Sequence, residues 1–241
     1  MRLIRSVPVI AGAIGVAVAG AVVMLPWVAG TAGAAAAVLL MTHPSVGRVT
    51  DAPVRVLLRA IPLLVAVAIM LRWWELSRWR SAEPFHTGRY PAAEPFAASL
   101  DLDRYRAAYA AELLAAGCLI LALVCTGAAV ARSLRRPRPA AVALAVTGGF
   151  LLTAAAWAAV RIALTGGETL RAHAETAAGI EGGAFLQPGL RYSAATAVSA
   201  GPVLDPGSAA LTGAALLGAT LAVLAGARLA TPDRTSPPAL E

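Results

Sequence analysis

Two ionisable residues, Glu112 and Arg161, stand inside long apolar runs and are the first candidates for chemistry. Glu112 lies about four residues into the run 108–131, and Arg161 lies about two residues from the end of the run 140–163. Charges inside apolar spans are costly, so they pair with one another or mark a path for ions or substrates. If the two runs are antiparallel helices, both residues lie at a similar depth. We therefore predict an intramembrane Glu112–Arg161 ion pair; the alternative is that each side chain reaches the lipid headgroups independently.

Histidine and acidic residues outside these runs offer little further chemistry. His43, His86 and His173 lie outside the confident spans and no two share a helix, so haem ligation from spans is not expected. No cluster has the ligand spacing of a zinc site. Glu168, His173 and Glu175 lie close together in sequence and could bind a metal weakly, but a solvated helix face explains them better. The sequence therefore predicts no catalytic residue, no metal site and no cofactor.

The composition is that of a membrane protein. Of the 241 residues, 59% are hydrophobic and 14% are charged, whereas a soluble domain carries roughly 25% charged residues. The net charge of +7 comes from Arg at the ends of apolar runs, and no nucleic-acid-binding motif is present, so nucleic acid is not an expected partner. All 20 basic residues are Arg, which indicates a high-GC bacterial genome and hence a bacterial plasma membrane.

The elements that must hold these residues are transmembrane helices. Each confident run has about 20 residues, enough to cross roughly 30 Å of hydrocarbon. These runs are 7–25, 108–131, 140–163 and 208–230. Two shorter runs, 28–41 and 56–71, either both cross or neither does, because the basic segments on each side fix the parity. We predict one all-α domain over residues 1–231, a polytopic bundle with six spans, or with four if neither short run crosses.

Orientation follows from the distribution of Arg. The loop RSLRRPRP contains Arg132, Arg135, Arg136 and Arg138 without an acid, so the positive-inside rule places it in the cytoplasm. The segments 72–107 and 164–207 then become external loops, and both termini are cytoplasmic. The tail 232–241 is expected to be disordered. One alternative for the N-terminus is a cleaved signal peptide, because a basic start and an apolar stretch precede a small-residue site.

The stretch RWWELSRWR, which follows the run 56–71, is typical of a helix leaving a membrane. Trp rings favour the headgroup layer, and Arg can place its charge in water while its stem stays in hydrocarbon. We predict interfacial anchoring on membrane lipid; a docking surface for a protein partner and a specific headgroup site are the alternatives. The predicted aromatic anchors are Trp73, Trp74, Trp79, Tyr105 and Tyr109.

Three functional classes remain. The first is a non-enzymatic subunit or scaffold of a membrane complex, with a protein partner or a homo-oligomer as its assembly. The second is a small transporter or channel-like subunit in which the Glu112 and Arg161 region opens onto water. The third is an envelope-facing membrane enzyme that uses Glu168, His173 or Glu175. The order of spans and loops recurs in many unrelated proteins and does not choose between these classes.

Overall fold

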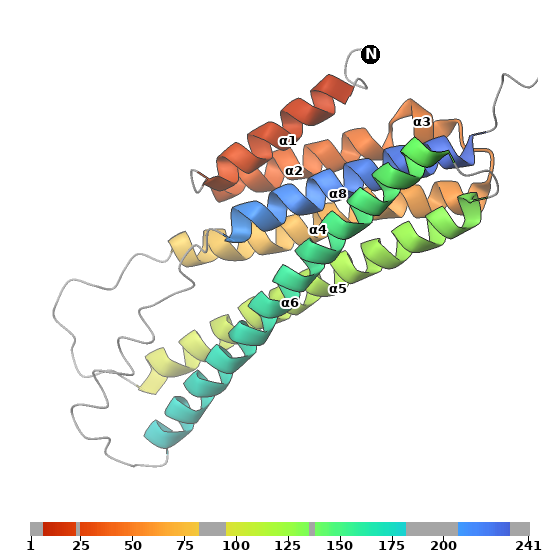
Figure 1. Cartoon of the computed structure of the whole chain (residues 1–241). Helices are drawn as coiled ribbons and strands as arrows, with labels where there is room; N and C mark the ends of the chain where they lie inside the picture. Colours follow the sequence, from red (N-terminus) through yellow and green to blue (C-terminus); the bar gives the residue numbers. More distant parts are fainter. Residues whose placement is uncertain (1–6, 23–24, 82–94, 135–137, 182–206, 232–241) are drawn as a thin grey trace, which may run out of the picture.

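The computed structural model describes residues 7–22, 25–81, 95–134, 138–181 and 207–231, and every regular element in these ranges is a helix. The prediction of an all-α fold is therefore confirmed for this part of the chain. Figure 1 shows the helices in chain order: α1 (Val7–Val22), α2 (Pro26–Met41), α3 (Pro44–Gly47), α4 (Ala52–Ser81), α5 (Pro95–Ser133), α6 (Pro139–Glu181) and α8 (Gly207–Ala230).

Proline residues set the starts of four of these helices. The first residues of α2, α3, α5 and α6 are Pro26, Pro44, Pro95 and Pro139. Proline suits this position because its fixed φ is helical and the first N–H groups of a helix have no intrahelical acceptor. The helix interiors that follow are rich in Ala and Leu, which have the highest helix propensities. Local sequence therefore both starts and sustains the helices.

Within the described residues, four stretches are long and apolar enough to cross a membrane: Ala52–Trp74, Arg106–Ser133, Pro139–Glu168 and Ala209–Ala230. The last three contain the predicted runs to within a residue. The first corrects the sequence reading, because the run 56–71 belongs to an apolar stretch of 23 residues. Conversely, the predicted first span lies in α1, which has only 16 residues, fewer than the roughly 20 that a crossing helix needs. A crossing by α1 or α2 therefore stays a prediction.

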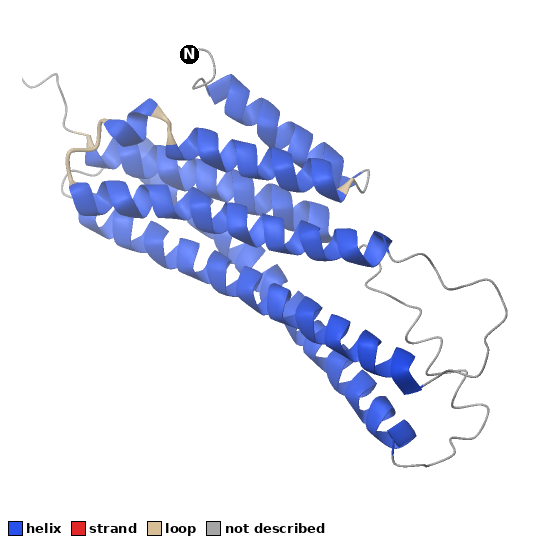
Figure 2. Ribbon diagram, turned by 180° about the vertical axis from the view of Figure 1, so that it is seen from behind, coloured by secondary structure: helices blue, strands red, loops and turns tan. Residues whose placement is uncertain are grey.

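The helices form a bundle with α8 at its centre (Figures 1 and 2). α8 contacts every other described helix, while α1 contacts α2 and α8. The ends of α5 and α6 that lie farthest from the 134–138 turn continue past the other helices as a long pair, seen at the lower left of Figure 1. Consecutive long helices are antiparallel, so the turn between α5 and α6 lies at the same end of the bundle as α3.

Glycine permits a close helix crossing between α6 and α8. A Cβ atom added at Gly148 would lie 2.9 Å from the carbonyl oxygen of Gly218 and 2.8 Å from the amide nitrogen of Ala222. The two backbones are thus in direct contact, as is common where small residues face one another in membrane helices. Gly226 similarly makes room for Leu58, whose Cδ2 atom would lie 2.6 Å from an added Cβ.

Two predicted loops are partly helical. α4 continues to Ser81 and α5 begins at Pro95, so much of the expected external segment 72–107 belongs to these helices. α6 likewise continues to Glu181 across the first part of the expected segment 164–207. Both helices continue beyond their apolar stretches. The residues that follow are more polar, but no proline interrupts the helix before Pro84 in the first case and Pro188 in the second. The rest of these two segments and the tail 232–241 lie outside the described residues.

Candidate functional site

A buried ion pair joins α4 to α5 near one end of the bundle. Arg72 Nη1 donates a hydrogen bond to Glu112 Oε1 at 2.7 Å. The two side chains are 7% and 11% exposed, so water screens the pair little. Arg72 follows the buried positions Ile61, Val65 and Ile69 along one face of α4, which points it into the bundle. A charge-assisted hydrogen bond of this length is among the stronger polar contacts in proteins.

Glycines on α6 provide the space in which the Glu112 carboxylate lies. A Cβ atom added at Gly166 would collide with Glu112 Oε2. One added at Gly167 would come within 3.1 Å of the Tyr109 ring. The hydroxyl of the neighbouring Thr165 donates to the carbonyl of Arg161, 3.0 Å away, within the same helix. Thus α4, α5 and α6 meet at one point, where the Glu112 carboxylate and the Tyr109 ring occupy the space that side chains at Gly166 and Gly167 would fill.

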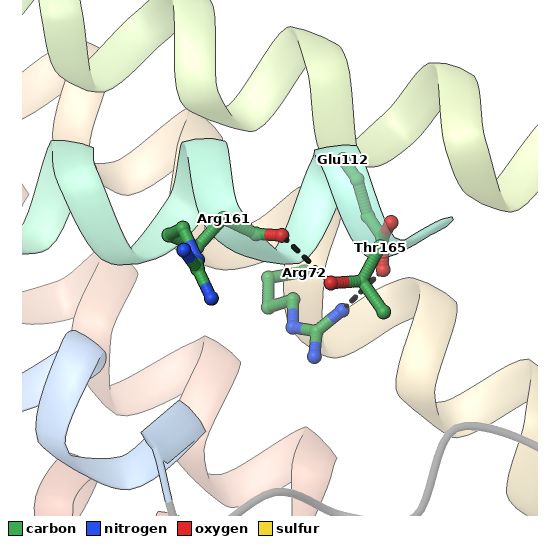
Figure 3. Close-up of polar contacts among 4 residues, drawn as sticks. All are labelled: Arg72, Glu112, Arg161 and Thr165. Carbon is green, nitrogen blue, oxygen red and sulfur yellow. Dashed lines mark hydrogen bonds and ion pairs between the residues drawn. The ribbon is translucent and has the colours of Figure 1, made fainter. Parts of the chain in front are cut away.

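Arg161 is not the partner that the structure gives to Glu112. Figure 3 shows the Glu112 carboxylate bonded to Arg72, with the Arg161 side chain lying apart from both. Arg161 is exposed on the outer face of α6. The sequence placed Glu112 and Arg161 correctly within their helices, but equal depth does not establish that two side chains face each other. The carboxylate is instead paired with a residue that the sequence suggested to be part of an interfacial anchor.

Trp73 also differs from its predicted role. It is only 2% exposed, and its Nε1–H donates to the hydroxyl of Thr212 on α8 at 3.1 Å. A buried indole needs such an acceptor, so Trp73 is a core residue that ties α4 to α8 rather than an anchor on lipid. It adjoins Arg72, and the Arg72–Glu112 and Trp73–Thr212 contacts together form a polar layer across the three helices α4, α5 and α8. We call this set of four residues the polar layer.

The structure describes the side chains of two of the four remaining predicted anchors. Trp74 is 43% exposed, as an interfacial residue would be. Tyr109 is half-buried and packs on Gly167. The side chains of Trp79 and Tyr105 lie outside the described residues.

At the opposite end of the bundle, the turn between α5 and α6 holds the basic loop. Arg138 Nη1 donates to the backbone carbonyl of Arg228 at 3.2 Å, so it caps the last turn of α8. Arg132 lies in the last turn of α5. Cations at helix C-termini offset the negative end of the helix dipole. Arg135 and Arg136 lie outside the described residues.

His43 forms the link between α2 and α3 at this same end. Its Nδ1 accepts a hydrogen bond from the backbone N–H of Ser45 at 3.3 Å, which caps α3. Burial, and secondarily the charge of Arg48, lowers the pKa of His43 below its ordinary value. The ring is therefore held neutral, as the capping bond requires.

The structure does not show the other predicted candidates, Glu168, His173 and Glu175, as a cluster. Glu168 is exposed on α6, and the side chains of His173 and Glu175 lie outside the described residues, as does His86. Among the described side chains, no group of three or more acidic, His or Cys residues could hold a metal ion. The hydroxyls of Thr126, Thr147 and Thr153 each donate to the carbonyl four residues earlier, as expected for threonines inside spans.

Two cavities flank the bundle. A space of about 10 Å³ lies between Trp27, Gly30, Thr31, Met70, Trp73 and Trp74, enough for about one water molecule. An open recess of about 440 Å³ lies beside Asp51, Ala131, Arg132 and Leu134. Neither cavity is lined by Arg72 or Glu112.

Sequence reasoning found Glu112 and singled out Trp73 in another role, but it missed the roles of Arg72, Thr212 and the paired glycines. The available signal was the spacing on α4: Leu58, Ile61, Val65 and Ile69 recur at helical intervals, and Arg72 continues the same face. Comparison of the chain with protein-family models, curated proteins and solved structures finds no match.

Proposed function

We propose that this protein is a non-enzymatic subunit or scaffold of a membrane complex, embedded in a bacterial plasma membrane. Its four long apolar helices cross the bilayer, and it works by presenting a fixed helical surface to a protein partner or to further copies of itself. The observation that carries the proposal is that the charged groups of the polar layer are buried and paired with each other. Glu112 and Arg72 form an ion pair at 2.7 Å, and both side chains are nearly fully buried.

The packing around the pair supports a structural role. A path for a substrate or ion needs room at its charged groups, but the Glu112 carboxylate occupies the space above Gly166. Trp73 and Thr212 close the layer on the side of α8. A buried charge pair in a packed setting fixes how two helices meet, because breaking it would leave an uncompensated charge. The polar layer therefore serves as the fixed register point of the bundle.

The distribution of charge supports the proposed orientation. Of the 20 Arg, eleven lie on the segments attached to the end of the bundle that holds α3 and the α5–α6 turn, against three acids. The segments at the other end carry nine Arg and ten acids. An excess of Arg marks the cytoplasmic side. The polar layer then lies on the external side, and both termini lie in the cytoplasm.

Cysteine labelling tests this orientation. In a background in which Cys118 and Cys125 are replaced by Ala, a single cysteine is placed at Arg136 or at Gln187. A membrane-impermeant maleimide applied to intact cells should label position 187 and should label position 136 only after the cells are opened. Labelling of position 136 in intact cells would overturn the orientation.

Purification tests the scaffold role. The tagged protein is extracted from its native host in mild detergent, and the co-purifying proteins are quantified by mass spectrometry. The proposal expects one of two results. The first is a single membrane partner in fixed stoichiometry, and tagging that partner should co-purify this protein. The second is a defined homo-oligomer, and disrupting it should abolish function. A monomer without a partner would contradict it.

One observation favours a second candidate, a small transporter or channel-like subunit. Ionisable groups buried in a span often mark a transport path, and the Arg72–Glu112 pair is such a group. The variant Glu112→Gln distinguishes the two roles. A transporter should lose more function than abundance, whereas a scaffold should lose the two in proportion. The matched control is Glu168→Gln, which removes the same charge from an exposed position of α6.

A further inference from the structure

We propose that Arg161 binds the phosphate group of an anionic phospholipid, so that α6 carries a lipid site on its outer face. This inference rests on the membrane placement proposed above and not on the scaffold role. Arg161 is exposed on α6, and Figure 3 shows its side chain apart from the Arg72–Glu112 pair. Among the described residues, no acidic side chain forms an ion pair with it.

The face of α6 that carries Arg161 is otherwise apolar over most of its length. Exposed on it are Val146, Phe150, Trp157 and Leu164. Trp157, one turn from Arg161, is 64% exposed. These side chains have the character of a surface that faces acyl chains. A guanidinium at the end of such a surface lacks both water and a protein anion at the level of its own Cα, so a lipid phosphate from outside the chain can supply the anion that the described residues do not.

The depth of Arg161 suits a phosphate. The apolar stretch Pro139–Glu168 has 30 residues, and at about 1.5 Å per residue Arg161 lies about 11 Å from its midpoint. Half of the hydrocarbon thickness is about 15 Å. The Cα atom of Arg161 is thus about 4 Å inside the hydrocarbon edge, within reach of the phosphate layer for a long side chain.

The chemistry of the side chain and the depth together select the ligand. A guanidinium presents paired N–H donors that match two phosphate oxygens. Trp157, one turn deeper on the same helix, offers an apolar ring beside the first part of the acyl chains. An anionic headgroup is favoured over a zwitterionic one because no cation of the lipid then competes with Arg161 for the phosphate.

Photocrosslinking in nanodiscs tests the site. The full chain is reconstituted in equal amounts of phosphatidylglycerol and phosphatidylcholine, with a trace of either lipid bearing a diazirine near its glycerol. Labelled residues are located by mass spectrometry. The readout is the ratio of phosphatidylglycerol to phosphatidylcholine labelling at residues 157–164, relative to the same ratio at the exposed, uncharged positions Leu113, Leu114 and Leu121 of α5.

The wild type should show a relative ratio of about five, the factor expected for one Arg near an anionic surface. Arg161→Gln should bring it to one, and Arg161→Lys should keep it above one. Arg55→Gln, which removes the same charge at the opposite end of the bundle, should leave it unchanged.

Three outcomes would overturn the proposal. A wild-type ratio of one would mean that Arg161 selects no anionic lipid. Absence of label at 157–164 in the natively extracted complex, with label on α5, would mean that a protein covers this face. Absence of label on both α5 and α6 would instead remove the membrane placement itself, which is a distinct failure.

Discussion

Removing the negative charge of Glu112 should destabilise the protein far more than removing a surface charge. The 2.7 Å contact between Arg72 and Glu112 puts the charge centres about 4 Å apart, and at an effective dielectric constant of about 20 their attraction is about 4 kcal/mol. In Glu112→Gln, Arg72 stays charged and nearly fully buried, because a guanidinium does not lose its proton. We expect the free energy of unfolding to fall by about 3 kcal/mol.

Replacing both partners should cost much less. Arg72→Met with Glu112→Leu removes both charges and keeps apolar volume, so its free energy of unfolding should lie within about 1 kcal/mol of the wild type. Arg72→Met alone should cost about 2 kcal/mol, less than Glu112→Gln, because a lone carboxylate can take up a proton. The coupling energy between the two sites follows from this cycle.

Unfolding in mixed micelles by SDS titration, followed by Trp fluorescence, gives the four free energies. Glu168→Gln is the matched control, because its side chain is exposed and its effect should stay within about 0.5 kcal/mol. The reasoning would be refuted if Glu112→Gln stayed within 1 kcal/mol of the wild type. It would also be refuted if the double variant were as unstable as the sum of the two single variants.

Three further predictions concern the surroundings of the pair and the α2–α3 link. Gly166→Ala should lower the free energy of unfolding by about 1–3 kcal/mol, because the added methyl collides with the Glu112 carboxylate; the same SDS titration measures it. Trp73→Phe should cost about 1–2 kcal/mol through the lost bond to Thr212, and Thr212→Val should add little to it in a double variant. Because burial lowers the pKa of His43, the neutral ring contributes stability above about pH 6.5 that is lost as the pH falls through the folded-state pKa, so the thermal midpoint should drop between pH 7.5 and 5.5.

Each of these has a control on the same chain. Gly117→Ala, at a helical glycine with no neighbouring atom within 4 Å, should be neutral or stabilising; equal losses at positions 117 and 166 would contradict the collision. Fully additive effects of Trp73→Phe and Thr212→Val would mean that the bond contributes nothing. His43→Asn keeps a capping acceptor that does not titrate; an unchanged pH dependence in that variant would exclude His43 as its source.

The long helices were largely predictable, and the errors arise from composition. Continuous apolar runs identify the spans of α5, α6 and α8 because only helices satisfy backbone groups in hydrocarbon. The span of α4 was underestimated because Arg55 and Arg72 bound the apolar run 56–71, although the helix continues through both. At the N-terminus the error is opposite: the apolar run extends past Val22, but α1 ends there and Pro26 begins a new helix.

The polar layer shows what a single sequence does not provide. The depth of a residue along a span can be counted from the ends of the apolar run, so Glu112 was recognised as a charge inside a span. Depth does not show which side chains face each other, because that depends on how each helix is rotated in the bundle. Arg161 was therefore chosen as the partner of Glu112, and Arg72 was not considered. Trp73 and Trp74 are adjacent and chemically identical, yet one is buried and the other exposed. Only the periodicity of α4 distinguishes them, because Trp73 follows Ile69 by one turn.

The ion pair joins two helices that are consecutive in the chain, which matters for how the protein enters the membrane. An unpaired Arg or carboxylate inside a span is costly at the insertion step, by about 2.5–3.5 kcal/mol at the helix centre and less toward its ends. Because α5 directly follows α4, Arg72 and Glu112 can neutralise each other as soon as this hairpin is synthesised, before α6 and α8 exist. A pair between Glu112 and Arg161 would have had to wait for α6. The chain order of the two charges thus lets the α4–α5 hairpin form with its buried pair already neutralised, before the glycines of α6 pack against it.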